Sequence, residues 1–411
     1  MTSLHHTSAL NSLDPADPQL SDLEPLRNSI AGARIVGIGE GAHFVREFTL
    51  ARARLLRYLV EQCGFTSLAF ELGYTEATKL NPWLAGDGTD ADLPELARPL
   101  TLAVFGELLR WLRSYNRGRS AVLHIVGIDL PTTLNLSPDL DAVAAYLREL
   151  DPPSVALLDD VLPAADEITG GSAVVSASQW SALGVARQES LSAGLARLSL
   201  RLRAMGPLYL RSGRRRDYAA ACRHVASAVH TDYQLRAMSD FFAGNGLPCD
   251  PSLREYYLAT TVQEQLAAPD TRIVVVAHNN HIQKTPVTFD GELAALPMGH
   301  YLAQSLGEGY RAVALTHTGD RVPEMAFPAA DSPVGFTVND VELAAPQPGS
   351  VERALVDAGL GDSITLTDLR KSEFTFTAIR SQSAVVDTDL HQAFDAVLSS
   401  PTATRDATVT F

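Results

Sequence analysis

The chain is poor in cysteine and has no long uncharged apolar run. Its three cysteines, Cys63, Cys222 and Cys249, are widely spaced among 411 residues, and none lies in a C-x-x-C pattern. This usage supports neither a disulfide framework nor a thiolate zinc site. A membrane-spanning helix needs about 20 predominantly apolar residues in succession, and no segment approaches that length. We therefore expect a cytoplasmic protein with reduced thiols and no association with a membrane.

Basic residues are outnumbered by acidic ones. The chain has 33 Lys and Arg against 48 Asp and Glu, which gives a net charge of −15. Affinity for nucleic acid comes largely from cationic side chains that release counterions from phosphates, so nucleic acid is not an expected partner. The sequence also has no G-x-S-x-G motif, so it gives no support to a serine acyl-enzyme of the α/β-hydrolase type.

Short apolar runs alternate with helical stretches in the first third of the chain. Runs at 34–38, 67–71 and 122–129 have the length of strands, and the residues between them show helical periodicity, most clearly at 45–63. This alternation favours an α/β fold with a mostly parallel sheet flanked by helices. We expect residues 1–136 to form the first half of an α/β catalytic domain.

The remaining residues divide into three segments. Residues 137–240 are rich in Ala, Leu and Arg with helical periodicity, which predicts an inserted all-helical module. The sheet pattern resumes over 241–330, the expected second half of the catalytic domain. Residues 331–411 are punctuated by Pro and Gly, and we expect an irregular or α+β segment packed on the core, with a final helix near 389–398.

Polar residues directly follow the first predicted strands. Glu40 and His43 lie in a Gly-containing loop after the strand at 34–38, Glu71 closes the next strand, and Asp129 closes the third. The carboxyl ends of parallel strands form the edge of the sheet where active sites lie. Asp129 is equally suited to capping a helix.

One arginine falls on the apolar side of the helix expected at 45–63. In a helical projection Arg52 lies in the middle of the apolar face, whereas Arg54 lies on the polar face. A guanidinium directed into the core needs a partner, because an unpaired buried charge is very costly. The alternatives are a structural ion pair, with Glu71 or with Glu40, and a clamp on the substrate. Without Arg52 as a partner, Glu71 is expected to have a raised pKa through desolvation.

Two histidines follow a later strand. His278 and His281 come directly after the apolar run at 272–277. Two imidazoles in one loop can act as base and acid or can bind a metal. The loops lack the H-x-x-x-H spacing that presets a zinc site, and the charge of Arg52 would repel a divalent cation. We therefore expect no metal and no other cofactor.

These motifs together resemble the erythromycin esterase family. They are G-E-x-x-H with R-E-F behind it (39–48), Arg52, G-F-T-x-x-A-F-E (64–71), G-I-D (127–129), R-E (254–255), A-H-N-x-H-I (277–282) and P-M-G (297–299). Members of this family open macrolide lactones by hydrolysis. The resemblance implies that His43 is the general base for water and that Glu40, Arg52, Glu71, His278 and His281 complete the site.

The chain departs from the family's resistance enzymes in the first loop. Gly41-Ala42-His43-Phe44 stands where those enzymes typically have Ala-Thr-His-Gly. We expect Phe44 to change the shape of the pocket, and we assign it to substrate binding together with Asp129 and Arg254. The motifs H-F-x-x-E-F (43–48) and H-I-Q-K-T-P (281–286) are closer to an uncharacterised bacterial branch. The expected partner is therefore a small-molecule substrate other than a macrolide: another ester or lactone, or a biosynthetic intermediate.

The leading hypothesis is hydrolysis. His43 takes a proton from water held near Glu40 and Glu71, and Arg52 or a protonated His278 stabilises the oxyanion. Three alternatives stay open: a non-hydrolytic cyclisation, elimination or epimerisation in natural-product biosynthesis, a metal-dependent hydrolase, and an inactive binding protein. The sequence gives no indication of the oligomeric state.

Overall fold

One large sheet forms the centre of the molecule. The computed structural model describes residues 4–267, 270–289, 292–327, 332, 334–373, 375–409 and 411. Within them, eight strands form a sheet in the order β1-β11-β14-β8-β2-β5-β3-β4. The strands are β1 (Thr7–Ala9), β2 (Ile35–Ile38), β3 (Ser67–Gly73), β4 (Ile125–Asp129), β5 (Ile273–Val276), β8 (Tyr310–His317), β11 (Thr365–Asp368) and β14 (Ala396–Ser400). All strands from β14 to β4 pair in parallel, and β11 is antiparallel to β14. The prediction of a mostly parallel sheet is confirmed.

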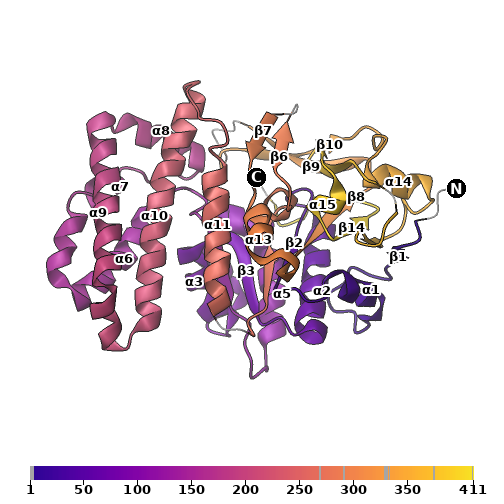
Figure 1. Cartoon of the computed structure of the whole chain (residues 1–411), viewed down its shortest axis with the longest axis horizontal. Helices are drawn as coiled ribbons and strands as arrows, with labels where there is room; N and C mark the ends of the chain where they lie inside the picture. Colours follow the sequence, from indigo (N-terminus) through magenta and orange to yellow (C-terminus); the bar gives the residue numbers. More distant parts are fainter. Residues whose placement is uncertain are drawn as a thin grey trace.

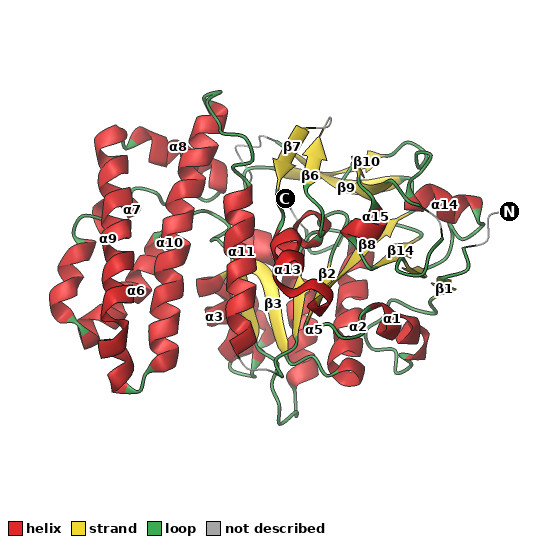
Figure 2. Ribbon diagram, viewed as in Figure 1, coloured by secondary structure: helices red, strands yellow, loops and turns green. Residues whose placement is uncertain are grey.

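Helices cover both faces of the sheet (Figures 1 and 2). Successive side chains of β5 enter opposite cores, because side chains alternate across a strand. Val274 and Val276 pack with α2 (Arg46–Cys63) and α5 (Pro99–Asn116). Ile273 and Val275 pack in the other core, which includes side chains of α11 (Ser252–Glu264) and α13 (Met298–Leu306). Burial on both faces explains why the central strands are continuous apolar runs.

The predicted helical module lies beside the sheet (Figure 1). Residues 137–242, all within the described part of the chain, contain helices and no strand. Their α-helices are α6 (Ser137–Leu150), α7 (Leu162–Ala165), α8 (Ala173–Ala182), α9 (Val185–Tyr209) and α10 (Arg215–Phe242). Two of them, α8 and α10, carry side chains into the cavity described below.

The C-terminal segment corrects the prediction made for residues 331–411. It does not merely pack on the core, because β11 and β14 are strands of the main sheet. The helix predicted near 389–398 is a single turn, α15 (Leu390–Ala393), followed by β14. Residues 396–398 are buried between β8 and β11, and this pairing outweighs their helical propensity. The predicted boundary between residues 330 and 331 lies outside the described residues.

Two small strand pairs lie near the loop that carries Glu40 and His43, and the C-terminal segment contributes to both. Strand β9 (Arg321–Ala326) pairs with β10 (Thr337–Glu342), and β12 (Ala378–Ser381) pairs with β13 (Ala384–Asp387). The remaining elements are α1 (Glu24–Ser29), α3 (Tyr74–Leu84), α4 (Leu93–Leu96), α12 (Asn279–Ile282), α14 (Val351–Asp357), β6 (Val287–Phe289) and β7 (Glu292–Ala295). Among the described residues, no helix has both the length and the hydrophobicity required to cross a bilayer.

The N-terminal segment covers the polar face of α2. Arg54 is buried, and its Nη2 donates to Oδ1 of Asp22 at 2.7 Å and to the carbonyl of Gln19 at 2.8 Å. Arg54 lies on the polar face of the helix, as the projection indicated, but this face is covered and the guanidinium is paired with Asp22. A projection of one helix cannot show which distant segment will pack against its polar face.

Candidate active site

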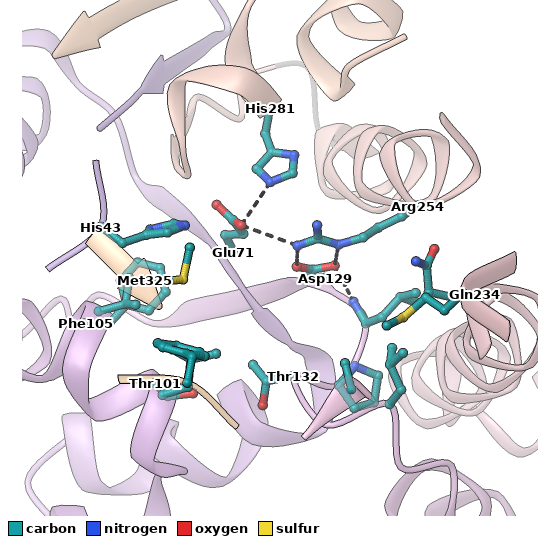
Figure 3. Close-up of a pocket in the computed structure, with 18 of the residues that line it drawn as sticks. His43, Glu71, Thr101, Phe105, Asp129, Thr132, Gln234, Arg254, His281 and Met325 are labelled. Atoms are coloured by element: carbon teal, nitrogen blue, oxygen red, sulfur yellow. Dashed lines mark hydrogen bonds and ion pairs between the residues drawn. The ribbon is translucent and has the colours of Figure 1, made fainter. Parts of the chain in front are cut away.

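A cavity of about 360 Å³ lies at the carboxyl ends of β2, β3 and β4 (Figure 3). Its polar and charged lining residues are His43, Glu71, Thr101, Asp129, Thr132, Gln234, Arg254 and His281, and the others are Phe44, Leu100, Val104, Phe105, Leu130, Pro131, Leu134, Ala173, Met238, Met325 and Phe336. Glu71 and Asp129 come from the ends of β3 and β4, Arg254 comes from α11, and His281 comes from the short helix α12 (Asn279–Ile282). The helical module supplies Ala173, Gln234 and Met238. The cavity therefore combines a charged wall with a larger apolar surface, which suits an uncharged organic ligand carrying one reactive polar group.

The loop between β2 and α2 presents His43 to this cavity. Nδ1 of His43 lies 2.8 Å from Oε1 of Glu40, whose side chain is buried beneath it. Burial alone would lower the pKa of His43, but the hydrogen bond with Glu40 and the charges of Glu40 and Glu71 raise it above the ordinary value. This hydrogen bond favours the tautomer with the proton on Nδ1, so that the neutral ring offers Nε2 as a base.

Arg52 is the second partner of Glu40. Its Nη2 lies 2.9 Å from Oε2 of Glu40, and the two side chains are 1% and 2% exposed. The guanidinium also donates to the carbonyl of Val104 at 3.3 Å and lies over the ring of Phe105. Arg52 thus pairs with Glu40 and not with Glu71, and it does not line the cavity. The expected role of Arg52 in stabilising an oxyanion is not supported by this position.

His281 lies between two carboxylates. Its Nε2 is 3.0 Å from Oε1 of Glu71, and its Nδ1 is 2.6 Å from Oε1 of Glu255 on α11. Burial would lower the pKa of His281, but the negative charges of Glu255 and Glu71 raise it to about 10. At neutral pH His281 is therefore a cation and is not available as a base.

Glu71 is held in its ionised form. His281 and Arg254 outweigh the effect of burial and keep the pKa of Glu71 well below its ordinary value. Oε2 of Glu71 also accepts a hydrogen bond from the backbone N–H of His278 at 2.8 Å. The expectation of a raised pKa for an unpaired Glu71 does not apply, because His281 and Arg254 supply the positive charge that Arg52 does not.

His278 lies behind His43, with the two ring centroids 4.9 Å apart. Its Nδ1 accepts a hydrogen bond from the N–H of Asn280 at 3.2 Å. Burial and the positive charge of His43 lower the pKa of His278 well below its ordinary value, so this ring is neutral. A protonated His278 cannot therefore stabilise the oxyanion at neutral pH, and the ring is not part of the cavity wall.

Asp129 fixes Arg254 in the wall of the cavity. Nε of Arg254 donates to Oδ1 of Asp129 at 2.9 Å, and Nη2 donates to Oδ2. Nη2 also reaches Oε1 of Glu71 at 3.4 Å. Burial would lower the pKa of Arg254, but Asp129 and Glu71 raise it. Asp129 is thus a partner of Arg254 in addition to accepting from the N–H of Leu130 at 2.7 Å.

Phe44 lines the cavity as expected, in an unusual backbone conformation. Its φ is 67°, in the left-handed region that glycine adopts without strain. In this chain the ring of Phe44 packs near Phe336 and Phe411, with each pair of centroids 6.1 Å apart. Aromatic packing offsets a backbone strain of roughly 1 kcal/mol.

Two residues of the site received no role from the sequence. Glu255 stands in the R-E motif beside Arg254, but only the structure shows that its Oε1 pairs with His281 and its Oε2 accepts from the N–H of Met298 at 2.8 Å. Gln382 gave no signal at all, although its Oε1 accepts a hydrogen bond from the backbone N–H of His43 at 2.6 Å.

The described residues contain no group of three or more His, Cys, Asp or Glu side chains arranged to hold a metal ion. Metal independence stays a prediction.

Comparisons with known proteins agree with this fold and show the family. A model of the erythromycin esterase family matches residues 60–403. The chain is 42% identical to an erythromycin esterase type I from Escherichia coli over 97% of both chains, and 32% identical to a type II enzyme from Escherichia coli over 94% of this chain and 93% of the other. A mutant of the erythromycin esterase EreC in its open conformation superposes with a TM-score of 0.93 at 39% identity, over 98% of this chain and 99% of that one. A succinoglycan biosynthesis protein with a TM-score of 0.75 and 21% identity, covering 96% of this chain and 94% of the other, shares the fold.

The fold, the charged cavity and these similarities define a hydrolase of carboxylic esters or lactones. The histidine and carboxylate residues that the sequence assigned to one site are brought together here at the carboxyl edge of a parallel sheet. The chain belongs to the erythromycin esterase family.

Proposed function

We propose that the protein hydrolyses the lactone ester of a macrolide-type substrate, with His43 as the general base. The observation that carries the mechanism is the 2.8 Å contact between Nδ1 of His43 and Oε1 of Glu40, within a loop that places the ring in the wall of the cavity. A buried carboxylate on one ring nitrogen orients the imidazole and increases the basicity of the other.

The reaction begins with water between His43 and the ester. Nε2 of His43 takes a proton as the water oxygen bonds to the carbonyl carbon, which gives a tetrahedral oxyanion. The bond from this carbon to the ring oxygen then breaks, and the protonated His43 returns the proton to the departing alkoxide. The product is the open-chain hydroxy acid, so one water is consumed and no covalent enzyme intermediate is formed.

Arg254 replaces Arg52 as the proposed electrophile. Arg254 lines the cavity and is held there by Asp129, and its Nη1 is not among the atoms that bind the two carboxylates. Fixed positive charge near a developing oxyanion stabilises the transition state more than the neutral ester. In this scheme Glu71, kept ionised by His281, orients the attacking water on the side of the cavity shared with His43 (Figure 3).

A second chamber beside the first is consistent with a substrate that contains a large ring. This chamber has a volume of about 320 Å³ and shares Leu100, Thr132, Ala173 and Phe336 with the cavity of His43. Drug-sized ligands occupy sites of roughly 300–1,000 Å³, so the two adjoining spaces suit a bulky, largely apolar lactone. The loop that contains Phe44 favours an ester other than a macrolide. The similarity to enzymes named erythromycin esterases over almost the whole chain makes macrolides the first class to test.

The test is product mass together with His43 variants. Purified protein is incubated with erythromycin, and the expected product is heavier by one water and carries a carboxylate. Conversion without a gain of mass would favour the non-hydrolytic alternative, and binding without conversion would favour an inactive receptor. His43→Gln and His43→Ala are expected to lower kcat at least by the roughly 10²–10⁴ typical of general acid-base groups. His124→Gln, at an exposed histidine, is the matched control; activity of the His43 variants equal to this control would reject the base.

A further inference from the structure

The loop that carries His43 is held by the C-terminal half of the chain. Between β12 and β13, the backbone N–H of Gln382 donates to the carbonyl of Gly41 at 2.6 Å. The side-chain Oε1 of the same glutamine accepts from the N–H of His43 at 2.6 Å. A single residue of the hairpin thus contacts two backbone groups of the catalytic loop, one on each side of Ala42.

The glutamine is itself held in one orientation. Its Nε2 donates to Oε1 of Glu324 at 3.2 Å, and Glu324 accepts through Oε2 from the N–H of Ser383 at 2.8 Å. The N–H of His43 needs an acceptor, and the carboxylate of Glu324 needs a donor. Only one orientation of the Gln382 amide satisfies both neighbours. Gln382 has a φ of 53°, a left-handed conformation that is uncommon outside glycine. Such strain is retained where the surroundings fix the backbone.

The space around the loop leaves little freedom for another arrangement. A Cβ atom added at Gly41 would lie 2.7 Å from the carbonyl oxygen of Leu315 and 3.3 Å from that of Arg380, the residue two before Gln382. The next residue of β9 after Glu324 is Met325, which lines the cavity. The same stretch of β9 therefore supports Gln382 and forms part of the wall that faces the substrate.

We infer that Gln382 is a positioning residue for His43, acting through the backbone of the catalytic loop, with Glu324 fixing the glutamine amide. Gln382 does not touch the reacting atoms. Its contribution is to hold the backbone of His43 where Nδ1 meets Glu40 and Nε2 reaches the water. A small displacement of a catalytic group can lower the rate by about a hundredfold without weakening substrate binding.

The test uses a set of variants of the full chain. Its kinetic part rests on the proposed esterase activity. Gln382→Met keeps the length of the side chain but removes the acceptor, and it is expected to lower kcat by about tenfold to a hundredfold while KM changes by less than about threefold. Gln382→Glu keeps an acceptor but places a carboxylate against Glu324, and kcat is expected to fall as well. Combining Gln382→Glu with Glu324→Gln restores a donor and an acceptor between the two positions. Because the N–H of Met325 donates to Oε1 of Glu324 at 2.8 Å and loses this acceptor, only part of the lost kcat is expected to return. Val385→Thr, at an exposed position of β13, is the control and should behave as the wild type.

A second measurement does not depend on turnover. Hydrogen exchange of a peptide covering residues 40–46 should be faster in Gln382→Met than in the control, and the double variant should regain protection. Inactivity of the wild type towards erythromycin would count against the proposed function, whereas unchanged protection of this peptide in Gln382→Met would overturn the inference. Unchanged kcat in Gln382→Met, or failure of the double variant to recover above Gln382→Glu, would overturn it too.

Discussion

Nε2 of His281 lies 3.0 Å from Oε1 of Glu71, in the wall of the cavity that holds His43. Because Glu255 contacts the other ring nitrogen, this histidine is a fixed cation whose charge keeps Glu71 ionised. His281 is therefore protonated and His278 neutral, although the two lie three residues apart, and these states do not fit the acid-base pair expected from the sequence.

The raised pKa of His281 makes stability depend on pH. The folded-state pKa is about 10 against an ordinary value of 6.5, so this group stabilises the native state fully below 6.5, and the contribution is lost as the pH rises towards 10. We expect the free energy of unfolding in urea to fall over this window in the wild type. His281→Gln should be less stable at neutral pH, because Glu71 and Glu255 lose the cation between them, and its stability should vary less with pH. His124→Gln serves as the control, and a wild-type stability that stays constant from 6.5 to 10 would contradict the assignment.

The fall of kcat/KM at acid pH should follow the protonation of His43. Its pKa is raised, and only the neutral ring can take a proton from water, so kcat/KM should increase with pH through a midpoint above 6.5. Glu40→Gln removes the charge and alters the hydrogen bond that favour the protonated ring. The midpoint should therefore move to lower pH while the plateau rate falls. Glu107→Gln, at an exposed carboxylate of α5, should leave the profile unchanged. If the midpoint does not move in Glu40→Gln, then Glu40 does not raise the pKa of His43.

Arg52 should matter for folding through its buried pairing with Glu40. Arg52→Met leaves the Glu40 carboxylate buried without its cation, and we expect a loss of roughly 3–5 kcal/mol in the free energy of unfolding. Adding Glu40→Gln should recover much of this stability but no activity. Arg54→Met is the matched control, because Arg54 is buried on the same helix and pairs with Asp22. It should lower stability while kcat per folded molecule is retained. An Arg52→Met protein as stable as the wild type would show that the pair contributes little.

The two chambers give a prediction about substrate size. Ala173, at the start of α8, lines both of them, so Ala173→Trp should fill space at the wall that they share. KM for erythromycin is expected to rise by more than about tenfold, since a bulky side chain in a filled site costs roughly 1–3 kcal/mol. A short ester that fits the cavity of His43 alone should be hydrolysed as before. Ala182→Trp, at an exposed position of the same helix, is the control. Equal effects on the large and the small ester would show that the second chamber does not hold substrate.

Chelation tests the need for a metal. Arg254 and the cationic His281 both line the cavity, and like charges at short range oppose a divalent cation. We expect kcat to be unchanged after exhaustive EDTA treatment, with elemental analysis of the same sample. Loss of activity that returns with one equivalent of a divalent ion would reverse this prediction and make His43 a candidate ligand.

The sheet and the convergence of the site could be predicted because both follow from local patterns. Apolar runs alternating with helices predicted parallel strands. Glu71 and Asp129 end two of those runs and Glu40 directly follows a third, so these residues were expected to meet at one edge. The strand at Ala396–Ser400 could not be recognised in this way. Its apolar residues fit a helix equally well, and only the place between β8 and β11 decides for a strand.

The sequence by itself determined that Glu71, Asp129 and the loops carrying His43 and His281 meet at one edge, because strand-end positions in a parallel sheet share that edge. It also determined that Arg52 faces inward, since helical periodicity fixes the side of a helix on which a residue lies. Only the tertiary structure decided which charges pair and therefore which groups are ionised. Arg52 pairs with Glu40, His281 is protonated between Glu71 and Glu255, and Gln382 reaches the catalytic loop across 339 positions of the chain. Pairing and pKa depend on separations of a few ångströms between residues from distant segments, and such separations leave no periodicity in the sequence.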